Sequence, residues 1–381
     1  MNYLVLGAGR MGFGAAFDLI HNGGEETVTI ADVDEGRARE AATRIGSDRI
    51  TPVQIDVTDD NAVLELMAGK DAVISCVVYH HNVKLARLAI AARANFCDLG
   101  GNNDVVEAEL AMNDEARAAG VNVIPDCGLA PGMVAVLAAH GIERFDSVDS
   151  VRIRVGGLPL EPKPPLNYQI VFSVEGLINE YVEPARVLRD GKIVTVASMT
   201  EIETLDFPSP FGLMEAFQTS GGTSTLPHTY LGKIRDLDYK TIRYPGHCDV
   251  FRAMIDLGLA SSELVEVDGV RVRPRRLLGD LLQRNLPADE PDVVLVRIDF
   301  EGMKGGRKLE LRYQIIDRAD EKNGLSAMMR TTAFPAAIVA RLMAEKQTTA
   351  AGALPQERCI PPVPFVDALR ARRIEIEMTE H

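Results

Sequence analysis

A glycine motif near the N-terminus is the feature that most constrains the fold of this chain. Residues Gly7–Gly12 read GAGRMG, which fits the pattern G-x-G-x-x-G, and they directly follow the short apolar run Tyr3–Leu6. Apolar residues then recur at helical spacing through Met11–His21, and a β-branched run ends at Asp32. A strand, a tight turn, a helix and a second strand form a βαβ unit, whose two strands are parallel.

The motif and Asp32 together predict a dinucleotide site. Gly7 permits the tight turn, Gly9 lets the backbone approach a pyrophosphate, and Gly12 lets the helix pack closely on the strand. The helix start presents free N–H groups and a partial positive charge to the phosphates. Asp32 can accept hydrogen bonds from both ribose hydroxyls and repels a 2′-phosphate, so we predict NAD rather than NADP as the cofactor.

Four further strand–helix repeats follow this first unit. Apolar strands are expected at residues 50–55, 71–76, 96–99 and 121–124, and helices at 35–45, 61–67, 83–93 and 107–119. Strands that are separated by crossover helices imply a parallel sheet with both faces covered. The fold class predicted for residues 1–130 is therefore α/β, a doubly wound parallel sheet of the Rossmann type.

In such a sheet the ligand lies beyond the carboxyl ends of the strands. The loop after the third strand is expected at the adenine end, and the loops after the fourth and fifth strands nearer the nicotinamide. An ordinary connecting loop is the alternative for each of them. Arg37 and Arg39, on the helix after Asp32, could soften the preference for NAD. The cofactor residues predicted in this way are Gly7, Gly9, Arg10, Met11, Gly12, Asp32, Asp56, Val57, Cys76, Tyr79, Asp98 and Gly100.

The pattern changes after Cys127–Gly132. Longer strands with polar–apolar alternation are expected at residues 150–155, 192–196, 293–300 and 309–316. Residues 131–330 are therefore predicted to form an α+β domain on an open mixed sheet, which binds the substrate and takes part in oligomer contacts. An apolar helix expected at residues 331–346 packs back on the first domain, so that residues 331–381 complete it. A cleft is expected at the boundary between the two domains.

Charge and cysteine content exclude several classes of function. Lys plus Arg total 41 and Asp plus Glu total 55, and the resulting net charge of −14 repels nucleic-acid phosphates and anionic lipids. No apolar run approaches the roughly 20 residues that span a bilayer. Five cysteines without a C-x-x-C pair are typical of reduced thiols in a cytoplasmic protein. We expect a small-molecule substrate, no nucleic-acid or membrane partner, and no metal site, since the adjacent His80 and His81 diverge.

Motifs along nearly the whole chain resemble those of the saccharopine dehydrogenase-like superfamily, and most closely those of its lysine-oxidising members. The second-domain motifs are more specific than the glycines, because generic dinucleotide folds do not require them. The motifs that carry the resemblance are Gly7–Gly12 with Asp32, Asp98–Gly100, Cys127–Gly132, Gly156–Pro159, Leu166–Tyr168, Phe172-Ser173, Glu175–Leu177, Asn179–Tyr181, Glu215–Phe217, Thr219–Gly222 and Lys240–His247.

The resemblance implies oxidation of the ε-amino group of L-lysine by NAD, with water entering and ammonia leaving. The product, allysine, cyclises to a piperideine carboxylate. The alternative is a saccharopine reductase or carboxynorspermidine dehydrogenase type of enzyme, which makes or breaks secondary amines and often prefers NADP. Those relatives carry an acidic residue at the place of Ala130, so Ala130 and Asp32 favour the lysine reaction. The resemblance also implies a homo-oligomer, and a redox-sensing nucleotide-binding protein is the non-enzymatic alternative.

Oxidation of lysine requires a deprotonated ε-amine, which the site can obtain by desolvating the amine, by a general base or by working at alkaline pH. The ε-amine has a pKa near 10.4, so removing its proton at pH 7 costs roughly 4.6 kcal/mol. His247 follows Pro245-Gly246 after an expected strand, and we predict that it is the general base. A helix-capping role, or a contact with the cofactor amide, is the alternative for this histidine.

The remaining site residues follow from the substrate's other groups. Arg243 is predicted to bind the α-carboxylate, with an ordinary ion pair as its alternative. Tyr168 and Tyr244 are candidate hydrogen-bond donors. Glu175 is a candidate acceptor for the α-ammonium group, or else the cap of a helix that begins there.

Overall fold

The computed structural model describes residues 1–380, which divide into two compact units. The first unit comprises Met1–Arg144, Ser224–Thr229 and Met329–Glu375. The second comprises Phe145–Thr223, Tyr230–Met328 and residues 376–380. The first unit thus continues past the predicted boundary at residue 130, and the last residues of the chain belong to the second unit.

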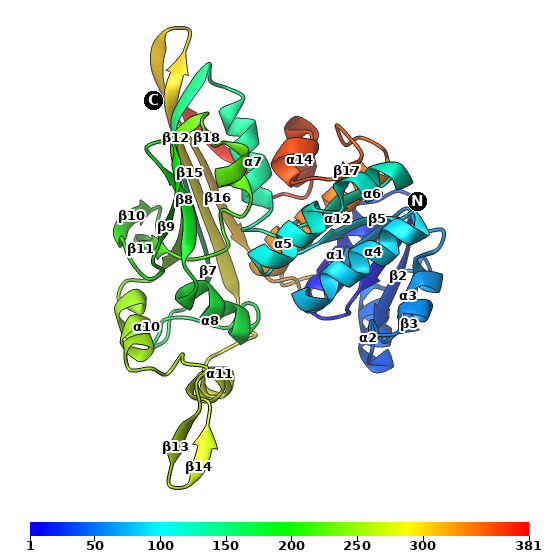
Figure 1. Ribbon diagram of the computed structural model, residues 1–381, viewed down its shortest axis with the longest axis horizontal. Helices are drawn as coiled ribbons and strands as arrows, with labels where there is room; N and C mark the ends of the chain where they lie inside the picture. The colour runs from blue at the N-terminus through cyan, green and yellow to red at the C-terminus, as the bar shows by residue number, and fades with distance from the viewer. Residues whose placement is uncertain (381) are drawn as a thin grey trace. The chain divides into compact units, whose positions relative to one another are not determined.

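The first unit contains a seven-stranded sheet in the order β17-β6-β5-β4-β1-β2-β3, in which every neighbouring pair is parallel (Figure 1). The central strands are short and almost wholly apolar because helices cover both faces of the sheet. The strands are β1 (Asn2–Leu6), β2 (Thr27–Asp32), β3 (Ile50–Gln54), β4 (Ala72–Ser75), β5 (Asn95–Asp98), β6 (Asn122–Ile124) and β17 (Gly352–Ala353).

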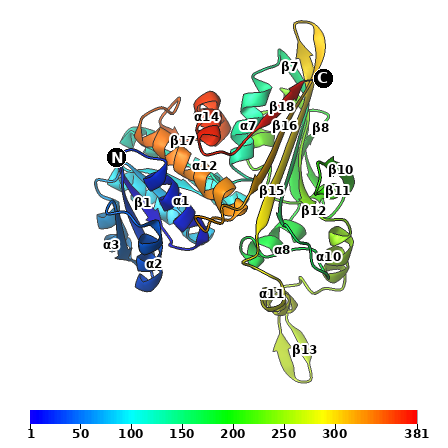
Figure 2. The ribbon, with the colours of Figure 1, turned by 180° about the vertical axis from the view of Figure 1, so that it is seen from behind.

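Helices α1 (Arg10–His21) and α12 (Ala327–Ala344) lie together on one face of this sheet (Figure 2). A Cβ built on Gly14 of α1 comes within 2.9 Å of the Ala333 Cβ of α12, so the two helices touch closely. The opposite face packs against α3 and α4 through a core that includes Leu4 and Leu6. The other helices associated with this unit are α2 (Glu35–Ile45), α3 (Asp60–Met67), η1 (Tyr79–His81), α4 (Asn82–Ala92), α5 (Asn103–Leu110), α6 (Asn113–Ala119), α7 (Met133–Ile142), α9 (Leu226–Thr229), α13 (Gln356–Cys359) and α14 (Pro362–Ala371).

One predicted helix, at residues 107–119, is two helices in the structure. The first, α5, starts earlier, at Asn103, because the Asn102 side chain caps it by accepting the N–H groups of Asp104 and Val105. The chain then turns at Ala111-Met112, which places Met112 in the core, and α6 begins at Asn113. An alanine-rich run gives no signal for such a break, because each of its residues favours a helix.

The second unit is built on a nine-stranded mixed sheet with the main order β10-β11-β12-β7-β15-β16-β18. Only the β12–β7 pair is parallel. This sheet, together with the parallel sheet of the first unit, confirms the predicted fold class. The strands are β7 (Ser147–Pro159), β8 (Ala185–Arg189), β9 (Lys192–Val196), β10 (Glu203–Phe207), β11 (Gly212–Gln218), β12 (Ile234–Arg243), β15 (Asp292–Lys304), β16 (Arg307–Arg318) and β18 (Glu377–Glu380).

Three helices and a separate two-stranded ribbon complete the second unit. The helices are α8 (Val174–Val182), α10 (His247–Asp256) and α11 (Pro274–Asn285), and the ribbon consists of β13 (Val265–Val267) and β14 (Val270–Val272). Within residues 1–380, no helix combines the length and apolar character that crossing a membrane requires.

Candidate functional site

The glycine loop after β1 has the geometry that its motif predicts. Gly7 has φ = 93°, a left-handed conformation that favours glycine. A Cβ on Gly12 would lie 1.7 Å from the Gly7 carbonyl oxygen, so only glycine allows α1 to pack this closely. A Cβ on Gly9 would meet nothing within 4 Å, which means that its backbone borders open space.

The surroundings of this loop fit a dinucleotide. Helix α1 has no side-chain cap and no acidic residue in its first turn, so its N–H groups are available to a pyrophosphate. Asp32, at the end of β2, accepts the N–H groups of Ala8 at 2.7 Å and Asp34 at 2.9 Å. Its carboxylate is thereby fixed beside the glycine loop, where a ribose is expected. Arg10 is exposed and Met11 is half-buried at the start of α1.

Two alanine substitutions should separate cofactor contact from folding in this loop. Gly9→Ala is expected to weaken NAD⁺ binding about tenfold or more while the free energy of unfolding changes by less than about 0.5 kcal/mol. Gly12→Ala is expected to destabilise the protein by about 1–3 kcal/mol, because its Cβ overlaps the Gly7 carbonyl. Calorimetric titration and urea unfolding measure the two effects. Wild-type cofactor binding by Gly9→Ala would contradict the site.

The other predicted cofactor residues lie in the loops at the carboxyl ends of β3, β4 and β5. Asp56 accepts the N–H and the hydroxyl of Thr58, and these hydrogen bonds lower the pKa of its carboxyl. Val57 follows it and is half-buried. Cys76 packs its carbonyl under Gly7, and burial raises the pKa of its thiol.

Tyr79 and Gly100 lie in the loops that follow β4 and β5. Tyr79 belongs to η1, and its ring lies so close to Gly101 that a Cβ there would be 2.9 Å from it. Gly100 has φ = 80° and faces the Asp126 carboxylate. The structure thus brings these loops to one edge of the sheet, as a dinucleotide site requires; the individual cofactor contacts stay predictions.

A group of buried carboxylates lies beneath the loops after β5 and β6. Asp98 is fully buried, and its Oδ1 accepts the N–H groups of Gly100 at 2.6 Å and Asp126 at 3.1 Å. Burial, and next the charge of Asp98, raise the pKa of Glu109 on α5 to about 11. The same two causes raise the pKa of Asp126 to about 8, and its carboxylate accepts a hydrogen bond from Ser224. The Asp98 side chain therefore holds two loops together from inside the unit.

In the second unit, a chain of hydrogen bonds joins three residues from two separate motifs, Asn179–Tyr181 and Lys240–His247. The Arg243 Nε donates to the Tyr181 hydroxyl at 2.8 Å, and this hydroxyl lies 3.0 Å from the His247 Nε2. The His247 Nδ1 lies 2.8 Å from the Leu166 carbonyl oxygen, which can only accept. The Nδ1 therefore carries the proton, and the Nε2 accepts the proton of Tyr181.

These hydrogen bonds and the burial of the ring determine the protonation state of His247. Burial, and next the Arg243 charge, lower the pKa of the imidazole to about 3, so the ring is neutral at pH 7. Both ring nitrogens are engaged, which leaves no lone pair free for a substrate proton. The geometry favours a role in positioning Tyr181 and Arg243, and the base role that we predicted is not shown.

Arg243 is buried, and one of its nitrogens remains free for a ligand. Its Nη1 donates to the Ile242 carbonyl at 2.9 Å, and its guanidinium carbon lies 4.8 Å from the centre of the Tyr168 ring. Its Nη2 has no hydrogen-bond partner among residues 1–380. Tyr168, a predicted hydrogen-bond donor, thus lies against Arg243, and burial raises the pKa of its hydroxyl to about 12; its role as a donor to the substrate stays a prediction.

Glu180 is the site residue that the sequence reasoning missed. Burial raises the pKa of its carboxyl to about 7, although the nearby Arg243 charge acts in the opposite direction. The carboxylate has no hydrogen-bond partner within the described part of the chain. Its neighbour Tyr181 and the preceding Leu177 lie on the buried side of α8, and this spacing could have pointed to Glu180.

The loop Thr219–Thr223 borders the same cluster. Thr219 and Thr241 join their hydroxyls at 2.7 Å, and Thr241 donates to the Tyr239 hydroxyl at 3.3 Å. A Cβ on Gly222 would lie 2.3 Å from the Tyr239 ring, so the loop runs directly over this ring. The Ser220 N–H donates to the Glu180 backbone carbonyl at 3.0 Å, so the loop lies beside this part of α8. The charge of Glu180 raises the pKa of Tyr239, and that of Arg243 lowers it.

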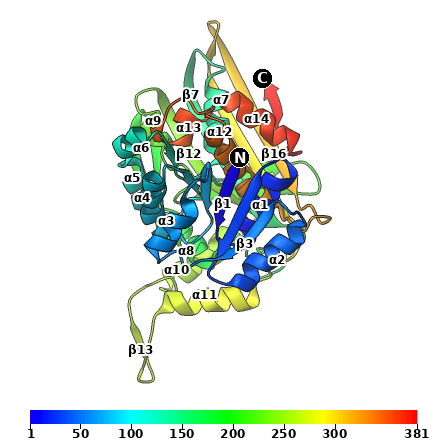
Figure 3. The ribbon, with the colours of Figure 1, turned by 90° about the vertical axis from the view of Figure 1, so that its right-hand side faces the viewer.

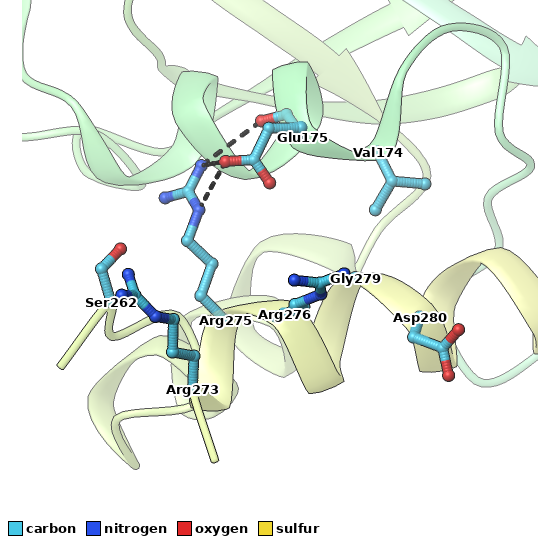
Figure 4. A pocket seen from close by; sticks show the side chains of 8 residues that line it. All are labelled: Val174, Glu175, Ser262, Arg273, Arg275, Arg276, Gly279 and Asp280. Atoms are coloured by element: carbon cyan, nitrogen blue, oxygen red, sulfur yellow. Dashed lines mark hydrogen bonds and ion pairs between the residues drawn. The ribbon is translucent and has the colours of Figure 1, made fainter. Parts of the chain in front are cut away.

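Two predicted residues lie apart from this cluster. The Tyr244 hydroxyl donates to the Pro159 carbonyl at 2.9 Å. Glu175 faces a different cavity, of about 510 Å³, where it forms an ion pair with Arg275 at 2.8 Å (Figure 4). Its side chain is 65% exposed, and it also stands in the first turn of α8, where a carboxylate is favourable. Glu175 and Glu180 are about 140° apart around the helix, so their side chains leave it on different sides.

Comparison with known proteins agrees with both units. Residues 3–124 match the saccharopine dehydrogenase NADP-binding domain, and residues 128–374 match the saccharopine dehydrogenase C-terminal domain. The chain belongs to the saccharopine dehydrogenase family. This membership confirms the resemblance seen in the sequence, and it shows that the first unit is a nicotinamide dinucleotide-binding domain.

Relatives in this family differ in length and in name. The saccharopine dehydrogenase (NADP⁺, L-glutamate-forming) of Saccharomyces cerevisiae is 26% identical over 274 residues, which are 70% of this chain and 60% of that enzyme. The mitochondrial alpha-aminoadipic semialdehyde synthase of Mus musculus is 25% identical over 296 residues, 70% of this chain and 31% of that protein. The chain thus spans at most about three fifths of these first curated relatives.

Two comparisons extend over almost the whole chain. The carboxyaminopropylagmatine dehydrogenase of a Synechocystis species is 21% identical over 389 residues, covering 96% of this chain and 94% of that enzyme. The structure of apo saccharopine dehydrogenase (L-Glu forming) from Saccharomyces cerevisiae superposes with a TM-score of 0.80 at 21% identity, covering 100% of this chain and 99% of that one. The family fold therefore extends over both units.

Proposed function

We propose that this member of the saccharopine dehydrogenase family oxidises the ε-amino group of L-lysine with NAD⁺, the reaction of an L-lysine 6-dehydrogenase. The observation that carries the proposal is the buried Arg243 guanidinium, whose charge acts on the carboxyl of the half-buried Glu180. A guanidinium with a free Nη2 can bind one carboxylate, and a neighbouring carboxylate without a partner can accept a proton from an ammonium group. NAD⁺, which the glycine loop and Asp32 would hold, would supply the hydride acceptor, and water would replace the nitrogen, so that allysine, ammonia and NADH are the products.

A single cation favours lysine over saccharopine. Within residues 1–380, Arg243 is the one cation whose charge lowers the pKa values of both Glu180 and Tyr181. Arg154, the other buried arginine on the neighbouring strand, is paired with Asp238 at 2.8 Å. Saccharopine carries three carboxylates and calls for further cations, whereas free lysine carries one. The charge at this site therefore suits a substrate with one carboxylate.

The residues around Arg243 fix it for this task. His247, held by the Leu166 carbonyl, orients the Tyr181 hydroxyl, and that hydroxyl accepts the Nε–H of Arg243. The guanidinium is therefore pre-oriented, so that binding a carboxylate costs little side-chain entropy. The Tyr168 ring packs against the guanidinium from one side.

Glu180 takes the role of general base in this proposal. A carboxyl whose pKa is about 7 is half ionised at neutral pH, which suits the removal of the amine proton and the later activation of water. His247, with a pKa of about 3 and both nitrogens engaged, is the positioning residue instead. The group that titrates near neutrality in this cluster is thus a glutamate rather than the histidine that we predicted.

Substitution of these two residues tests the assignment. Glu180→Gln is expected to lower kcat about 100-fold and to remove the acidic limb of the kcat/KM profile, which reports a free-enzyme group with pKa near 7. His247→Gln should lower activity as well but keep that limb, because it disturbs only the orientation of Tyr181. If the limb disappears in His247→Gln and persists in Glu180→Gln, the two roles are reversed.

The residues around Asp32 favour NAD over NADP. Arg37 and Arg39 could neutralise a 2′-phosphate, but Arg37 pairs with Asp34 at 3.7 Å and Arg39 forms an ion pair with Glu35. We expect the Kd for NADP⁺ to exceed that for NAD⁺ at least tenfold, and Asp32→Ser to reduce the difference, because the repelling carboxylate is removed. Fluorescence titration of both cofactors measures this. A tenfold preference for NADP⁺ would overturn the assignment.

The reaction itself can be tested directly. Purified protein is incubated with L-lysine and NAD⁺ at about pH 9–10, where the free amine is abundant, and NADH and ammonia are measured. We expect one ammonia for each NADH. The main alternative is reductive condensation, in which an aldehyde and an amine consume NADPH without releasing ammonia. NADPH consumption with such pairs, and no NADH from lysine, would favour that alternative.

A further inference from the structure

The cavity drawn in Figure 4 lies between α8 and α11, and neither Arg243 nor Glu180 lines it. Figure 3 shows α11 at the end of the second unit from which the β13-β14 ribbon extends. The volume of the cavity is about 510 Å³, which is within the usual range of small-molecule sites. The polar residues that line it are Glu175, Ser262, Arg273, Arg275, Arg276 and Asp280.

Both carboxylates that line this cavity are already paired with a cation. Glu175 forms an ion pair with Arg275 at 2.8 Å. Asp280 forms one at 2.9 Å with Arg284, which follows it by one turn of α11 and does not line the cavity. Neither carboxylate is therefore left to balance the other arginines of the cavity.

The other two arginines of the cavity are unpaired. Arg273 is the N-cap of α11 and Arg276 its third residue, so the two side chains lie on the same side of the helix start. Within residues 1–380, neither side chain forms a hydrogen bond or an ion pair. The positive end of a helix disfavours cations at these positions, where Ser, Asp or Glu is usual. An anion bound in the cavity would remove the repulsion between these unpaired charges.

Side chains, rather than the backbone of α11, would hold such an anion. The N–H groups of Arg275 and Arg276 donate to the carbonyl oxygens of Ser261 and Arg273, both at 3.0 Å, and are not available to a ligand. The donors that remain are the two unpaired guanidinium groups and the Ser262 hydroxyl, which has no hydrogen-bond partner among the described residues. The cavity thus offers several donors and two uncompensated positive charges, in a chain whose net charge is −14.

Arg275 fixes the wall of the cavity. Its side chain is only 13% exposed, and its Nε donates to the Glu175 carboxylate at 2.8 Å. Its Nη2 donates to the side-chain oxygen of Asn179 on the same helix. Figure 4 shows Arg275 reaching from α11 to α8 in this way. The two helices are therefore held together without a ligand, and binding requires little reorganisation of the cavity.

We propose that this cavity binds a small molecule that carries a phosphate group. A phosphate monoester has close to two negative charges on one group at neutral pH, which matches the two unpaired guanidinium groups of Arg273 and Arg276. A dicarboxylate divides the same charge between two separate groups. The lining residues are polar except for Val174 and Gly279, so the cavity suits a compact, polar ligand rather than one with an acyl chain.

Calorimetric titration of the full chain with inorganic phosphate and with glycerol 3-phosphate tests the proposal. Saturating NADH is present, so that the glycine loop is already filled. We expect a Kd of about 1 mM or lower for glycerol 3-phosphate. Arg273→Gln with Arg276→Gln should raise this Kd at least about tenfold, because both unpaired charges are lost. Arg271→Gln with Arg307→Gln removes the same charge from exposed positions outside the cavity, and it should change the Kd less than about twofold.

Two further titrations identify the site and the ligand class. Arg243→Met should bind glycerol 3-phosphate as the wild type does, so the result is independent of the proposed lysine oxidation. Glutarate, a dicarboxylate, should bind at least about fivefold more weakly than glycerol 3-phosphate. Absence of binding by the wild type up to about 20 mM would overturn the proposal. Equal Kd changes in the two double variants would also overturn it, because they would show general attraction by charge. Tighter binding of glutarate would overturn the assignment of a phosphate.

Discussion

Replacement of Arg243 by methionine is expected to lower kcat/KM for L-lysine about 1,000-fold, mostly through KM. The reason is the loss of the buried Arg243 guanidinium, whose Nη2 is the charged donor left free for a substrate carboxylate beside Tyr168, Glu180 and Tyr181. A charge-assisted hydrogen bond in such buried surroundings contributes up to several kcal/mol to binding, part of it the cost of leaving the carboxylate unpaired. Methionine keeps most of the volume, so the tyrosine rings of Tyr168 and Tyr181 retain a packing partner. Steady-state kinetics over a wide lysine range measures the effect.

Two controls make this result specific. Arg243→Lys keeps the charge but loses the Nε–H that Tyr181 accepts, and it should fall between the wild type and the methionine variant. Tyr244→Phe removes the hydroxyl of the next residue in the chain, which donates to the Pro159 carbonyl. The KM of this variant for lysine should change less than about twofold. A methionine variant with the KM of the wild type and an unchanged fold would show that the substrate carboxylate binds elsewhere.

The parallel sheet could be predicted from the sequence because its signals are local and agree with one another. The apolar run before Gly7, the helical spacing after it and the carboxylate at Asp32 all specify the same βαβ unit. Strand β17 was missed because Gly352–Ala353 is too short to show a period, and it pairs with β6 more than 200 residues earlier in the chain. The break between α5 and α6 was missed because packing of Met112, rather than propensity, decides it.

The candidate site in the second unit was predictable only in part. Arg243 and Tyr168 were each predicted as site residues, without a contact between them, and in the structure the guanidinium lies over the Tyr168 ring although 75 residues separate the two in the chain. The choice between Glu175 and Glu180 depends on which side of α8 faces the sheet, and that is decided by tertiary packing. The state of His247 depends on the Leu166 carbonyl, a contact that spans 81 residues. Such long-range hydrogen bonds leave no local pattern in a sequence.

The second large effect is expected at Glu109, whose substitution should change how the free energy of unfolding depends on pH. Its pKa is about 11 in the folded protein and near 4.5 when exposed, so the folded state keeps a proton that the unfolded state releases above pH 4.5. The contribution of Glu109 to the free energy of unfolding is therefore largest below pH 4.5. It falls as the pH rises towards 11, by up to about 1.4 kcal/mol per pH unit. Glutamine has nearly the shape of the protonated acid and does not titrate. Glu109→Gln should thus stabilise the protein by up to ~3 kcal/mol more at pH 8 than at pH 6.

Urea unfolding of wild type and variant at about pH 6 and pH 8 measures this difference. Glu115→Gln, at an exposed position of the neighbouring helix α6, provides the control and should shift both midpoints equally. The carboxyl of Glu109 lies beside Asp98, whose Oδ1 holds the loops of Gly100 and Asp126. If Glu109→Gln stabilises the protein and leaves the cofactor affinity unchanged, the buried carboxyl of Glu109 lowers the free energy of unfolding and has no part in cofactor binding. If the difference in the free energy of unfolding between Glu109→Gln and wild type is the same at pH 6 and pH 8, Glu109 is not protonated in the folded protein. Another of the buried carboxyl groups, Asp98 or Asp126, must then hold the proton.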